Sequence, residues 1–360
     1  MTLPHRPHAI VPPYLLARIA ATEHPAFARA AAAAQRTLAI DPPERVQRTR
    51  LTLSVEAGDV LVAEATPAPD RTISDAGNAR NLPGMTVRRE DDPPVDDDAV
   101  NQAFDGLGAT FDLFAQVYAR NSIDGAGMPL LATVHYGEDY DNAFWNGTEM
   151  VFGDGDGEVF IGFTSSVTVV GHELAHGVTE HTAGLVYSAQ SGALNESLSD
   201  VFGALTEQHA AGQTADEASW LIGAGIFAPG VQGEALRSMK APGTAYDDDV
   251  LGKDPQPAHM RDYVETTDDN GGVHINSGIP NRAFHLAATA LGGHAWERAG
   301  LIWYRTLTGG SLSSTADFSA FALATLDAAT AEYGEESEET GAVRTAWTEV
   351  GVLEDDATRG

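Results

Sequence analysis

The chain has 360 residues, a formal net charge of −31 and no cysteine. This length allows about two domains with a substantial buried core, and the charge argues against binding to nucleic acid or to anionic membranes. The missing cysteine excludes disulfides, a cysteine nucleophile and a thiolate metal site, so any metal must be held by His, Asp and Glu.

The first 50 residues differ in charge from the rest of the chain. They carry seven arginines against three acidic residues, a net of +4, whereas the remainder has a net charge of −35. A basic leader on an acidic body indicates a segment that docks electrostatically on the rest of the chain, and a solvated helical tail is the alternative. Its apolar stretch is short and interrupted by Pro12-Pro13, which does not fit a secretory signal.

The predicted elements change along the chain from mixed to mainly helical. A helix is predicted over 14–38, a strand over 51–64, a helix over 98–119 and a strand over 129–136, before Gly-rich turns at 153–157. Further helices are predicted near 167–182, 193–211, 276–291, 295–306, 315–332 and 338–349. No apolar run is long enough for a transmembrane helix. Strands first and helices second indicate an α+β protein with a cleft between two lobes.

The segment VTVVGHELAHGVTEH (167–181) contains the pattern H-E-x-x-H. His172 and His176 are four residues apart, so on a helix both imidazoles project from one face and can share one metal ion. Glu173, next to the first histidine, can reach a water bound to that metal and take its proton, which makes the nucleophile. The pattern is short and alone is only suggestive.

Two later segments supply further polar candidates. In ALNESLSD (193–200), Glu196 is a third metal ligand if the next helix folds back antiparallel, and Asp200 can accept the free ring N–H of a ligand histidine. In DDNGGVHINSGIPN (268–281), His274 follows two glycines on a predicted tight turn, and Asp269 can orient its ring. A cation or donor in this setting can stabilise the oxyanion of a tetrahedral intermediate.

These segments, together with YDNAFWNG (140–147) and GLVYSAQSGALNESLSD (184–200), resemble the thermolysin family of neutral zinc metalloproteases. The resemblance covers about residues 71–353. It implies a two-lobed α+β fold, with a strand-rich N-terminal lobe, a helical C-terminal lobe and the active-site cleft between them. It also implies a zinc metalloendopeptidase that hydrolyses peptide bonds on the amino side of bulky apolar residues through a zinc-bound water activated by a glutamate.

The resemblance assigns a role to each matching position. His172, His176 and Glu196 are the implied zinc ligands and Glu173 the general base. His274 and Tyr187 are the implied oxyanion donors, with Asp269 orienting His274 and Asp200 contacting a zinc-bound histidine. The implied substrate contacts are Asn142, Ala143 and Arg237, and the implied apolar pocket is lined by Phe160, Phe163, Val169, Ile222, Ile226 and Leu236.

The calcium positions of the family are largely missing. At the positions that match the family's paired calcium site, this sequence has Thr168, Ser219, Leu221 and Ala224, and only Glu207 is acidic. Calcium requires six to eight oxygen ligands, so a double site is not expected, although calcium at a single other site stays open.

The leader resembles the short prosegments of protealysin-like precursors through IVPPYLL (10–16). The expected organisation is a prosegment over 1–55 (boundary between 50 and 70), an N-terminal lobe over 56–183 and a helical lobe over 184–360. The prosegment should act as an intramolecular inhibitor, with Tyr14, Leu15 and Leu16 inserting into the active site. A monomeric protein is expected that acts on proteins or peptides and is secreted without an evident signal, with a cytoplasmic location as the alternative.

Two other classes of protein compete with an active enzyme. An inactive protease fold used for binding normally has a broken base or ligand, and Glu173, His176 and Glu196 are intact. A structural zinc site is normally closed by four protein ligands, and only three are evident in this sequence.

Overall fold

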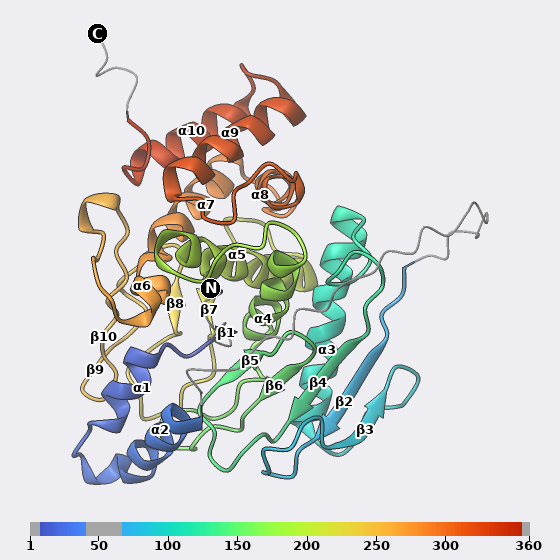
Figure 1. Cartoon of the computed structure of the whole chain (residues 1–360), viewed down its shortest axis with the longest axis vertical. Helices are drawn as coiled ribbons and strands as arrows, with labels where there is room; N and C mark the ends of the chain where they lie inside the picture. The colour runs from blue at the N-terminus through green and yellow to red at the C-terminus, as the bar shows by residue number, and fades with distance from the viewer. Residues whose placement is uncertain (1–7, 41–66, 355–360) are drawn as a thin grey trace, which may run out of the picture.

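A mixed sheet forms one half of the molecule and a group of helices forms the other, in the computed structural model of the chain (Figure 1). The structure describes residues 8–40 and 67–354. The predicted two-lobed α+β fold is therefore confirmed for this part of the chain. The predicted strand over 51–64 and the predicted prosegment boundary lie outside the described residues.

The main sheet has six described strands in the order β1-β5-β6-β4-β2-β3. β2 is parallel to β4, and β4 is parallel to β6, whereas the β2–β3, β5–β6 and β1–β5 pairs are antiparallel. The outermost strand next to β5 is thus supplied by the beginning of the chain. The strands are β1 (His8–Ala9), β2 (Arg71–Asp75), β3 (Met85–Arg89), β4 (Leu130–Val134), β5 (Ala143–Trp145) and β6 (Met150–Phe152).

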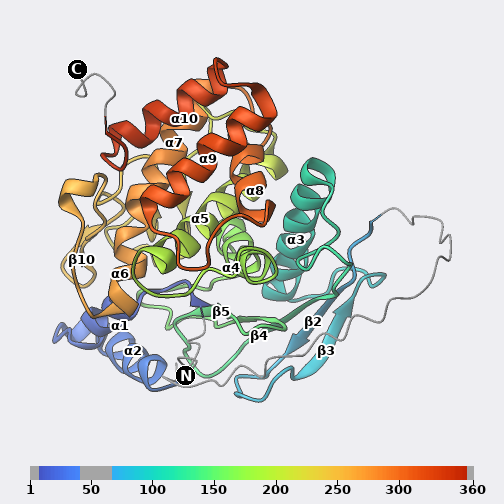
Figure 2. The ribbon, with the colours of Figure 1, turned by 45° about the horizontal axis from the view of Figure 1, so that its top comes forward.

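Helix α3 (Asp98–Asp112) packs against this sheet on the side facing the other helices (Figure 2). It begins where the Asp97 carboxylate accepts hydrogen bonds from the backbone N–H groups of Ala99 and Val100, which satisfies two amides that have no partner within the helix. A π-helical turn (Leu113–Val117) continues it, so the predicted helix over 98–119 is confirmed to within two residues.

Helices α4 (Val167–Glu180) and α5 (Ala189–Ala211) cross at short distance in the middle of the molecule. Gly203 makes this crossing possible, because a Cβ atom at this position would lie 2.6 Å from the backbone oxygen of Thr168 and 3.1 Å from the backbone nitrogen of His172. Both helices are buried along most of their length, so polar side chains between them must find partners there.

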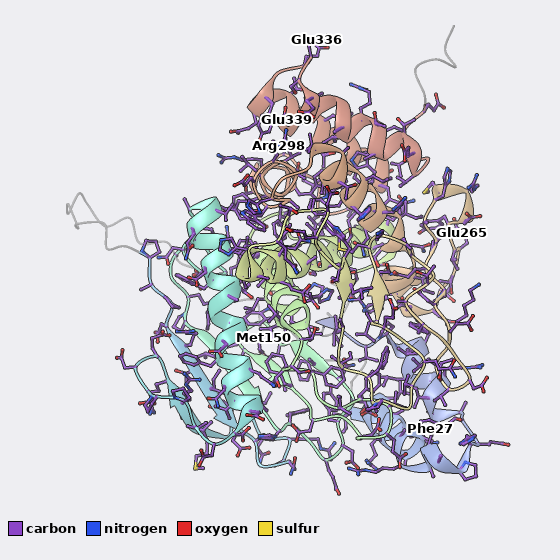
Figure 3. All side chains as sticks on the ribbon, turned by 180° about the vertical axis from the view of Figure 1, so that it is seen from behind. Phe27, Met150, Glu265, Arg298, Glu336 and Glu339 are labelled. Atoms are coloured by element: carbon purple, nitrogen blue, oxygen red, sulfur yellow. The ribbon has the colours of Figure 1, made fainter. Side chains whose placement is uncertain are left out.

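The C-terminal half adds a bundle of helices around α5 (Figure 2). Figure 3 shows Arg298 beside Glu339 near one end of the molecule, where the two side chains form an ion pair of 3.0 Å that joins the start of α8 to α10, while Phe27 lies near the other end. The helices are α6 (Asp269–Asn276), α7 (Gly278–Leu291), α8 (Ala299–Thr308), α9 (Phe318–Tyr333) and α10 (Glu338–Glu349).

Short elements between α5 and α6 complete the fold. They are the two-stranded sheets β7 (Leu221–Ile222) with β8 (Arg237–Ser238) and β9 (Asp247–Asp248) with β10 (Gly252–Lys253), and the 3-10 turn Met260–Asp262. No helix within the described residues is both long and apolar enough to cross a membrane.

The N-terminal segment, residues 8–40, lies along one side of the molecule, next to β5 and to the 247–253 hairpin (Figure 1). A single helix over 14–38 was predicted, and this is wrong. The segment forms α1 (Pro13–Ala20) and α2 (Ala28–Ile40), separated by the 3-10 turn Pro25–Phe27. Pro25 interrupts the helix because proline lacks the N–H that an uninterrupted helix would need there and restricts the residue before it.

Candidate active site

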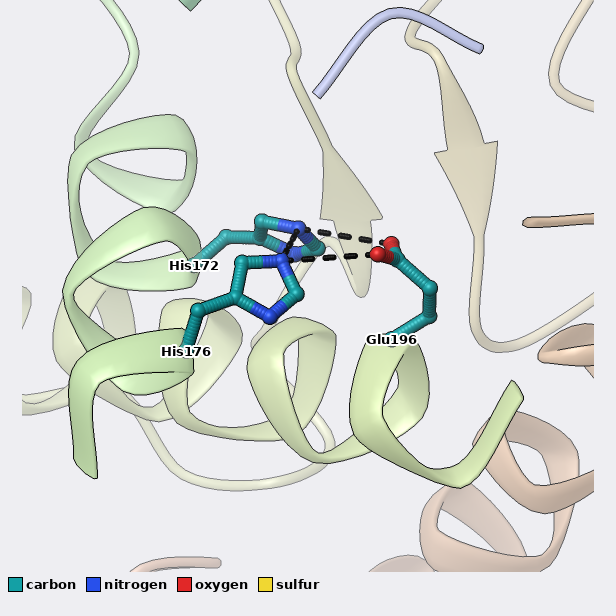
Figure 4. A group of neighbouring side chains, drawn as sticks. All are labelled: His172, His176 and Glu196. Atoms are coloured by element: carbon teal, nitrogen blue, oxygen red, sulfur yellow. Dashed lines mark hydrogen bonds and ion pairs between the residues drawn. The ribbon is translucent and has the colours of Figure 1, made fainter. Parts of the chain in front are cut away.

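Two histidines of α4 and one glutamate of α5 converge between the crossing helices (Figure 4). His172 Nε2 lies 3.0 Å from His176 Nε2, and the Glu196 carboxylate lies 3.5 Å from the first and 3.4 Å from the second. All three side chains are buried, and they form the only group of three or more His, Asp or Glu within the described ranges that could hold a metal ion.

The other ring nitrogens of the two histidines already have acceptors. His172 Nδ1 donates to the Asp200 carboxylate at 2.7 Å, and His176 Nδ1 donates to the side-chain oxygen of Asn195 at 2.8 Å. With these protons on Nδ1, both Nε2 atoms present lone pairs to each other, which is unfavourable unless a cation lies between them. Within residues 8–40 and 67–354, one oxygen of Glu196 likewise has no hydrogen-bond partner, although it is buried. The donor set therefore fits a metal ion.

Glu173 follows the first histidine on α4 and faces β5. One carboxylate oxygen accepts the backbone N–H of Trp145 at 3.0 Å, and the other is buried without a hydrogen-bond partner in the described part of the chain. Burial and the charge of Glu196 raise the pKa of Glu173, while the backbone N–H groups of Trp145 and Ile10 oppose that rise. The free oxygen is thus available to accept a proton.

His274 lies on α6 next to the metal-binding group, with its Nε2 3.6 Å from the Glu196 carboxylate. Asp269 holds it twice, because its carboxylate accepts the ring Nδ1 proton at 2.6 Å and the His274 backbone N–H at 2.9 Å. This arrangement needs the left-handed backbone of residues 269–272, where Gly271 and Gly272 adopt φ values of 88° and 75°. Burial lowers the pKa of His274, but the charges of Asp269 and Glu196 outweigh it and raise that pKa to about 9.

Tyr187 bridges the two sides of the site. Its hydroxyl donates to Glu196 and lies 3.3 Å from His274 Nε2. The Tyr187 hydroxyl would have to leave Glu196 before it could donate to another oxygen, whereas His274 Nε2 already donates to a carbonyl oxygen, that of Ala9.

Asp200 is the centre of a buried polar network. Besides His172, it accepts hydrogen bonds from Nε and Nη2 of Arg237 and from Nδ2 of Asn281, each at 2.8 Å. Burial raises its pKa, but Arg237 and His172 outweigh this and bring the pKa of Asp200 below its ordinary value. Arg237 thus couples the metal-binding helix pair to strand β8.

The residues predicted to line an apolar pocket are all fully or almost fully buried and belong to one continuous apolar cluster. The group is Phe160, Phe163, Val169, Ile222, Ile226 and Leu236. Ala143 lies in β5, and Asn142 directly precedes that strand.

The N-terminal segment enters this site. Ile10 donates its backbone N–H to the Ala143 carbonyl at 3.1 Å, and Val11 exchanges two hydrogen bonds with the Asn142 side chain. Tyr14, one of the residues expected to insert, belongs to the first turn of α1 and lies beside Tyr246, within electrostatic reach of Asp269. Its insertion into the active site stays a prediction. The backbone that contacts the site comes from the extended residues before α1.

Comparison with known proteins agrees with this geometry. Residues 66–180 match the family described as thermolysin metallopeptidase, catalytic domain, and residues 183–352 match its alpha-helical domain. The chain belongs to the thermolysin family of metallopeptidases. It is accordingly a metalloendopeptidase, and the predicted resemblance is confirmed.

Several relatives of this thermolysin-family chain are similar over most of their length. An extracellular metalloprotease of Pectobacterium carotovorum subsp. carotovorum is 56% identical over 283 residues, which are 79% of this chain and 81% of that protein. Protease PrtS of a Photorhabdus species is 53% identical, over 78% and 76% of the two chains. The solved precursor of protealysin, a metalloproteinase from Serratia proteamaculans, superposes with a TM-score of 0.86 and 51% identity, covering 96% of this chain and all of that one.

Some contacts in this thermolysin-family site were missed by sequence reasoning. Asn195 orients His176, and Asn281 reaches Asp200 from 81 residues away. The spacing of four residues between Asn195 and Ser199 was a usable signal, because it places both on the helix face that contacts His176. Nothing in the sequence pattern alone indicated the contact of Asn281.

Proposed function

We propose that this chain is a zinc endopeptidase that cleaves on the amino side of bulky apolar residues and is made as an autoinhibited precursor. The observation that carries the proposal is the pair of facing Nε2 atoms on His172 and His176, closed on a third side by Glu196. Two imidazoles and a carboxylate are a ligand set of catalytic zinc, which leaves a fourth position for water or substrate.

A bound zinc ion would supply a Lewis acid that polarises the scissile carbonyl and lowers the pKa of water. Glu173 would take the proton of the attacking water on its unpartnered oxygen and later deliver it to the leaving amine. His274 and Tyr187, which lie side by side, would donate hydrogen bonds to the developing oxyanion. Asp269 would keep His274 oriented for this task through its two contacts.

The six residues proposed to line an apolar pocket support a preference for Leu, Phe, Ile or Val after the cleaved bond. These residues carry no charged or polar side chain, and burying one large apolar side chain contributes about 1.5–3 kcal/mol. A peptide-library profile is the direct measurement. A profile dominated by charged residues after the cleaved bond would contradict this assignment.

Autoinhibition is supported by where the N-terminal segment lies. Its extended part contacts Asn142 and Ala143, the residues proposed to pair with substrate. Helix α1 buries Leu15, Leu16 and Ile19. This burial should contribute more to the binding free energy of the segment than its ion pairs with Asp139, because the arginines of those pairs, Arg29 and Arg36, are largely exposed. The blockade is steric.

We further propose that the protein is secreted. Names of similar proteins, such as the extracellular metalloproteases of Pectobacterium and Serratia, favour secretion. We expect a monomer that acts on protein or peptide substrates. We expect no paired calcium site, since four of its ligand positions carry Thr168, Ser219, Leu221 and Ala224.

The test uses two variants of the activated protein. Glu173→Gln should retain zinc by metal analysis and lose nearly all hydrolysis of casein, because the amide cannot take a proton. His172→Ala should lose the metal. Zinc loss in Glu173→Gln, or substantial turnover by it, would contradict the role given to this residue, and activity that survives a chelator would contradict the proposed function.

A further inference from the structure

One peptide bond of the N-terminal segment lies across the site in an extended conformation. Strand β1 pairs antiparallel with β5, in the register of His8 with Trp145 and Ala9 with Phe144, and this pairing places the chain beside the edge of the main sheet (Figure 1). The bond between Ala9 and Ile10 follows directly. Ile10 continues the pairing through its hydrogen bond to the Ala143 carbonyl.

The backbone groups on both sides of this bond are held by the residues proposed to hold substrate. The Ala9 carbonyl accepts a hydrogen bond from His274 Nε2 at 3.1 Å. The Ile10 carbonyl accepts one from Arg237 Nη1 at 3.2 Å, and the next amide, that of Val11, donates to Asn142 Oδ1 at 2.9 Å. The carbonyl carbon of Ala9 therefore lies on the His274 side and its leaving nitrogen on the β5 side.

The groups on the leaving side of the bond also fit cleavage. Ile10 is a bulky apolar residue with a side chain that is 0% exposed, in the same apolar cluster as Phe163 and Leu236. Its backbone N–H, which donates to the Ala143 carbonyl, is also close enough to Glu173 to oppose the rise in the pKa of that residue. The residue after this bond thus has the apolar side chain that the proposed specificity requires, and its nitrogen lies near the residue that would deliver the proton.

We infer that this chain cleaves its own Ala9–Ile10 peptide bond within the same molecule. The inference rests on the proposed peptidase function. Water supplies a hydroxyl group to the Ala9 carbonyl carbon, the carbon–nitrogen bond breaks, and Glu173 passes the proton to the Ile10 nitrogen. The products are the peptide 1–9 with a free carboxylate and a chain that begins at Ile10 with a free amine.

This first cleavage leaves the site covered. The remaining part of the segment stays anchored by α1, which buries Leu15, Leu16 and Ile19, and by α2, where the backbone N–H of Ala30 donates to the Glu158 carboxylate at 3.0 Å. The new amine of Ile10 lies beside the Glu173 carboxylate and gains a charge partner there. The cleaved segment therefore remains bound as a product, and a later cleavage elsewhere is needed to open the site.

The experiment follows the intact mass of the full-length, zinc-supplied chain over time. We expect a species that begins at Ile10, formed at a rate per molecule that does not change over a hundredfold range of protein concentration. Glu173→Gln should stay intact. Casein hydrolysis by the same preparation after trypsin activation is measured in parallel, as an independent test of the peptidase function.

Variants at Ile10 sharpen the outcome. Ile10→Leu should still be cleaved after Ala9, whereas Ile10→Asp should lose this cleavage because the pocket offers no partner for a carboxylate. An active caseinase with an intact Ala9–Ile10 bond overturns this inference and leaves the proposed function standing. A cleavage rate proportional to protein concentration also overturns it, because the cut would then occur between molecules. Absence of both cleavage and caseinolysis overturns the proposed function itself.

Discussion

Asp200 accepts the Nδ1 proton of His172 at 2.7 Å and at the same time receives two hydrogen bonds from the guanidinium of Arg237. One buried carboxylate thereby fixes the tautomer of a metal ligand and neutralises a buried arginine. The two tasks are distinguishable, since the first acts on metal affinity and the second on folding.

Replacing Asp200 with Asn should affect both. Zinc affinity should fall about 10- to 100-fold, because the amide no longer enhances the basicity of His172. The free energy of unfolding should fall by roughly 3–5 kcal/mol, because Arg237 stays buried without its counter-charge. Zinc competition with a chelator and thermal melting measure the two effects. Asp262→Asn, the same change at an exposed side chain, is the control and should alter neither.

Local patterns made the centre of this site predictable from the sequence. His172, His176 and Glu173 follow from helical periodicity, and Glu196 and Asp200 lie one turn apart on the next helix. The metal-binding group that these ligands were expected to form is present. The catalytic roles stay predictions.

Non-local contacts were not predictable in the same way. The pairing of β1 with β5 joins positions more than 130 residues apart, and two residues of extended chain give no periodic signal. The alanine-rich centre, Ala30 to Ala34, favours one continuous helix, and the interruption comes from the single residue Pro25. Asn281 reaches Asp200 only because α7 packs on α5, a tertiary arrangement that no local pattern contains.

Added calcium should protect this protein little against heat. Thr168 Oγ1 accepts the backbone N–H of Gly223 at 2.9 Å, so α4 and the 219–226 loop are joined directly at a position where the family's paired site would need a ligand. A ligand stabilises only to the extent that it occupies the native state. Melting of the Glu173→Gln variant with and without millimolar calcium is the measurement, and a rise of tens of degrees would show the expectation to be wrong.

His135 should stabilise the fold in a pH-dependent manner. Its two ring nitrogens contact Asp154 at 2.8 Å and Asp97 at 2.9 Å, which ties the start of α3 to the 153–157 turn. The hydrogen bond to Asp154 raises the pKa of His135 from 6.5 to about 9. Partial burial opposes this rise, and the hydrogen bond to Asp97 adds to it. A raised pKa in the folded state means that the stabilisation is complete below about pH 6.5 and is lost as the pH rises through 9.

His135→Asn should therefore lower the free energy of unfolding at pH 6 by roughly 1–2 kcal/mol, after allowance for the solvent that reaches this side chain. Asparagine is the suitable replacement, because His135 has a positive φ of 53° that asparagine tolerates. Melting of both proteins at pH 6 and pH 10 is the measurement. A difference of the same size at both pH values would show that the charge of His135 is not the cause.

Asp141 is a buried carboxyl group at the contact between the N-terminal segment and the rest of the chain. Its backbone N–H donates to Thr37 of α2 at 3.0 Å, whereas neither oxygen of its side chain has a hydrogen-bond partner among the described residues. Asp156 faces it with one oxygen that also has no partner, and Asp139, which pairs with Arg29 and Arg36, adds further negative charge. Burial and the charge of Asp156 raise the pKa of Asp141 to about 9.

Replacing Asp141 with Asn should stabilise the full-length protein at pH 7. Between pH 3.8 and about 9 the folded chain holds a proton on Asp141 that the unfolded chain releases, so stability falls as the pH rises through this window. At pH 7 this proton linkage lowers the free energy of unfolding by at most about 4 kcal/mol. We expect the variant to regain roughly 1–3 kcal/mol of it, because the asparagine amide can also donate to the free oxygen of Asp156. The gain should shrink toward pH 4.

Thermal melting in the Glu173→Gln background, which prevents self-digestion, is the measurement. Asp139→Asn makes the same charge change at a paired carboxylate and should give no gain. A lower melting temperature for Asp141→Asn at pH 7 would mean that this carboxylate is ionised and bound to a cation, and the account of it as a proton-holding group would be wrong.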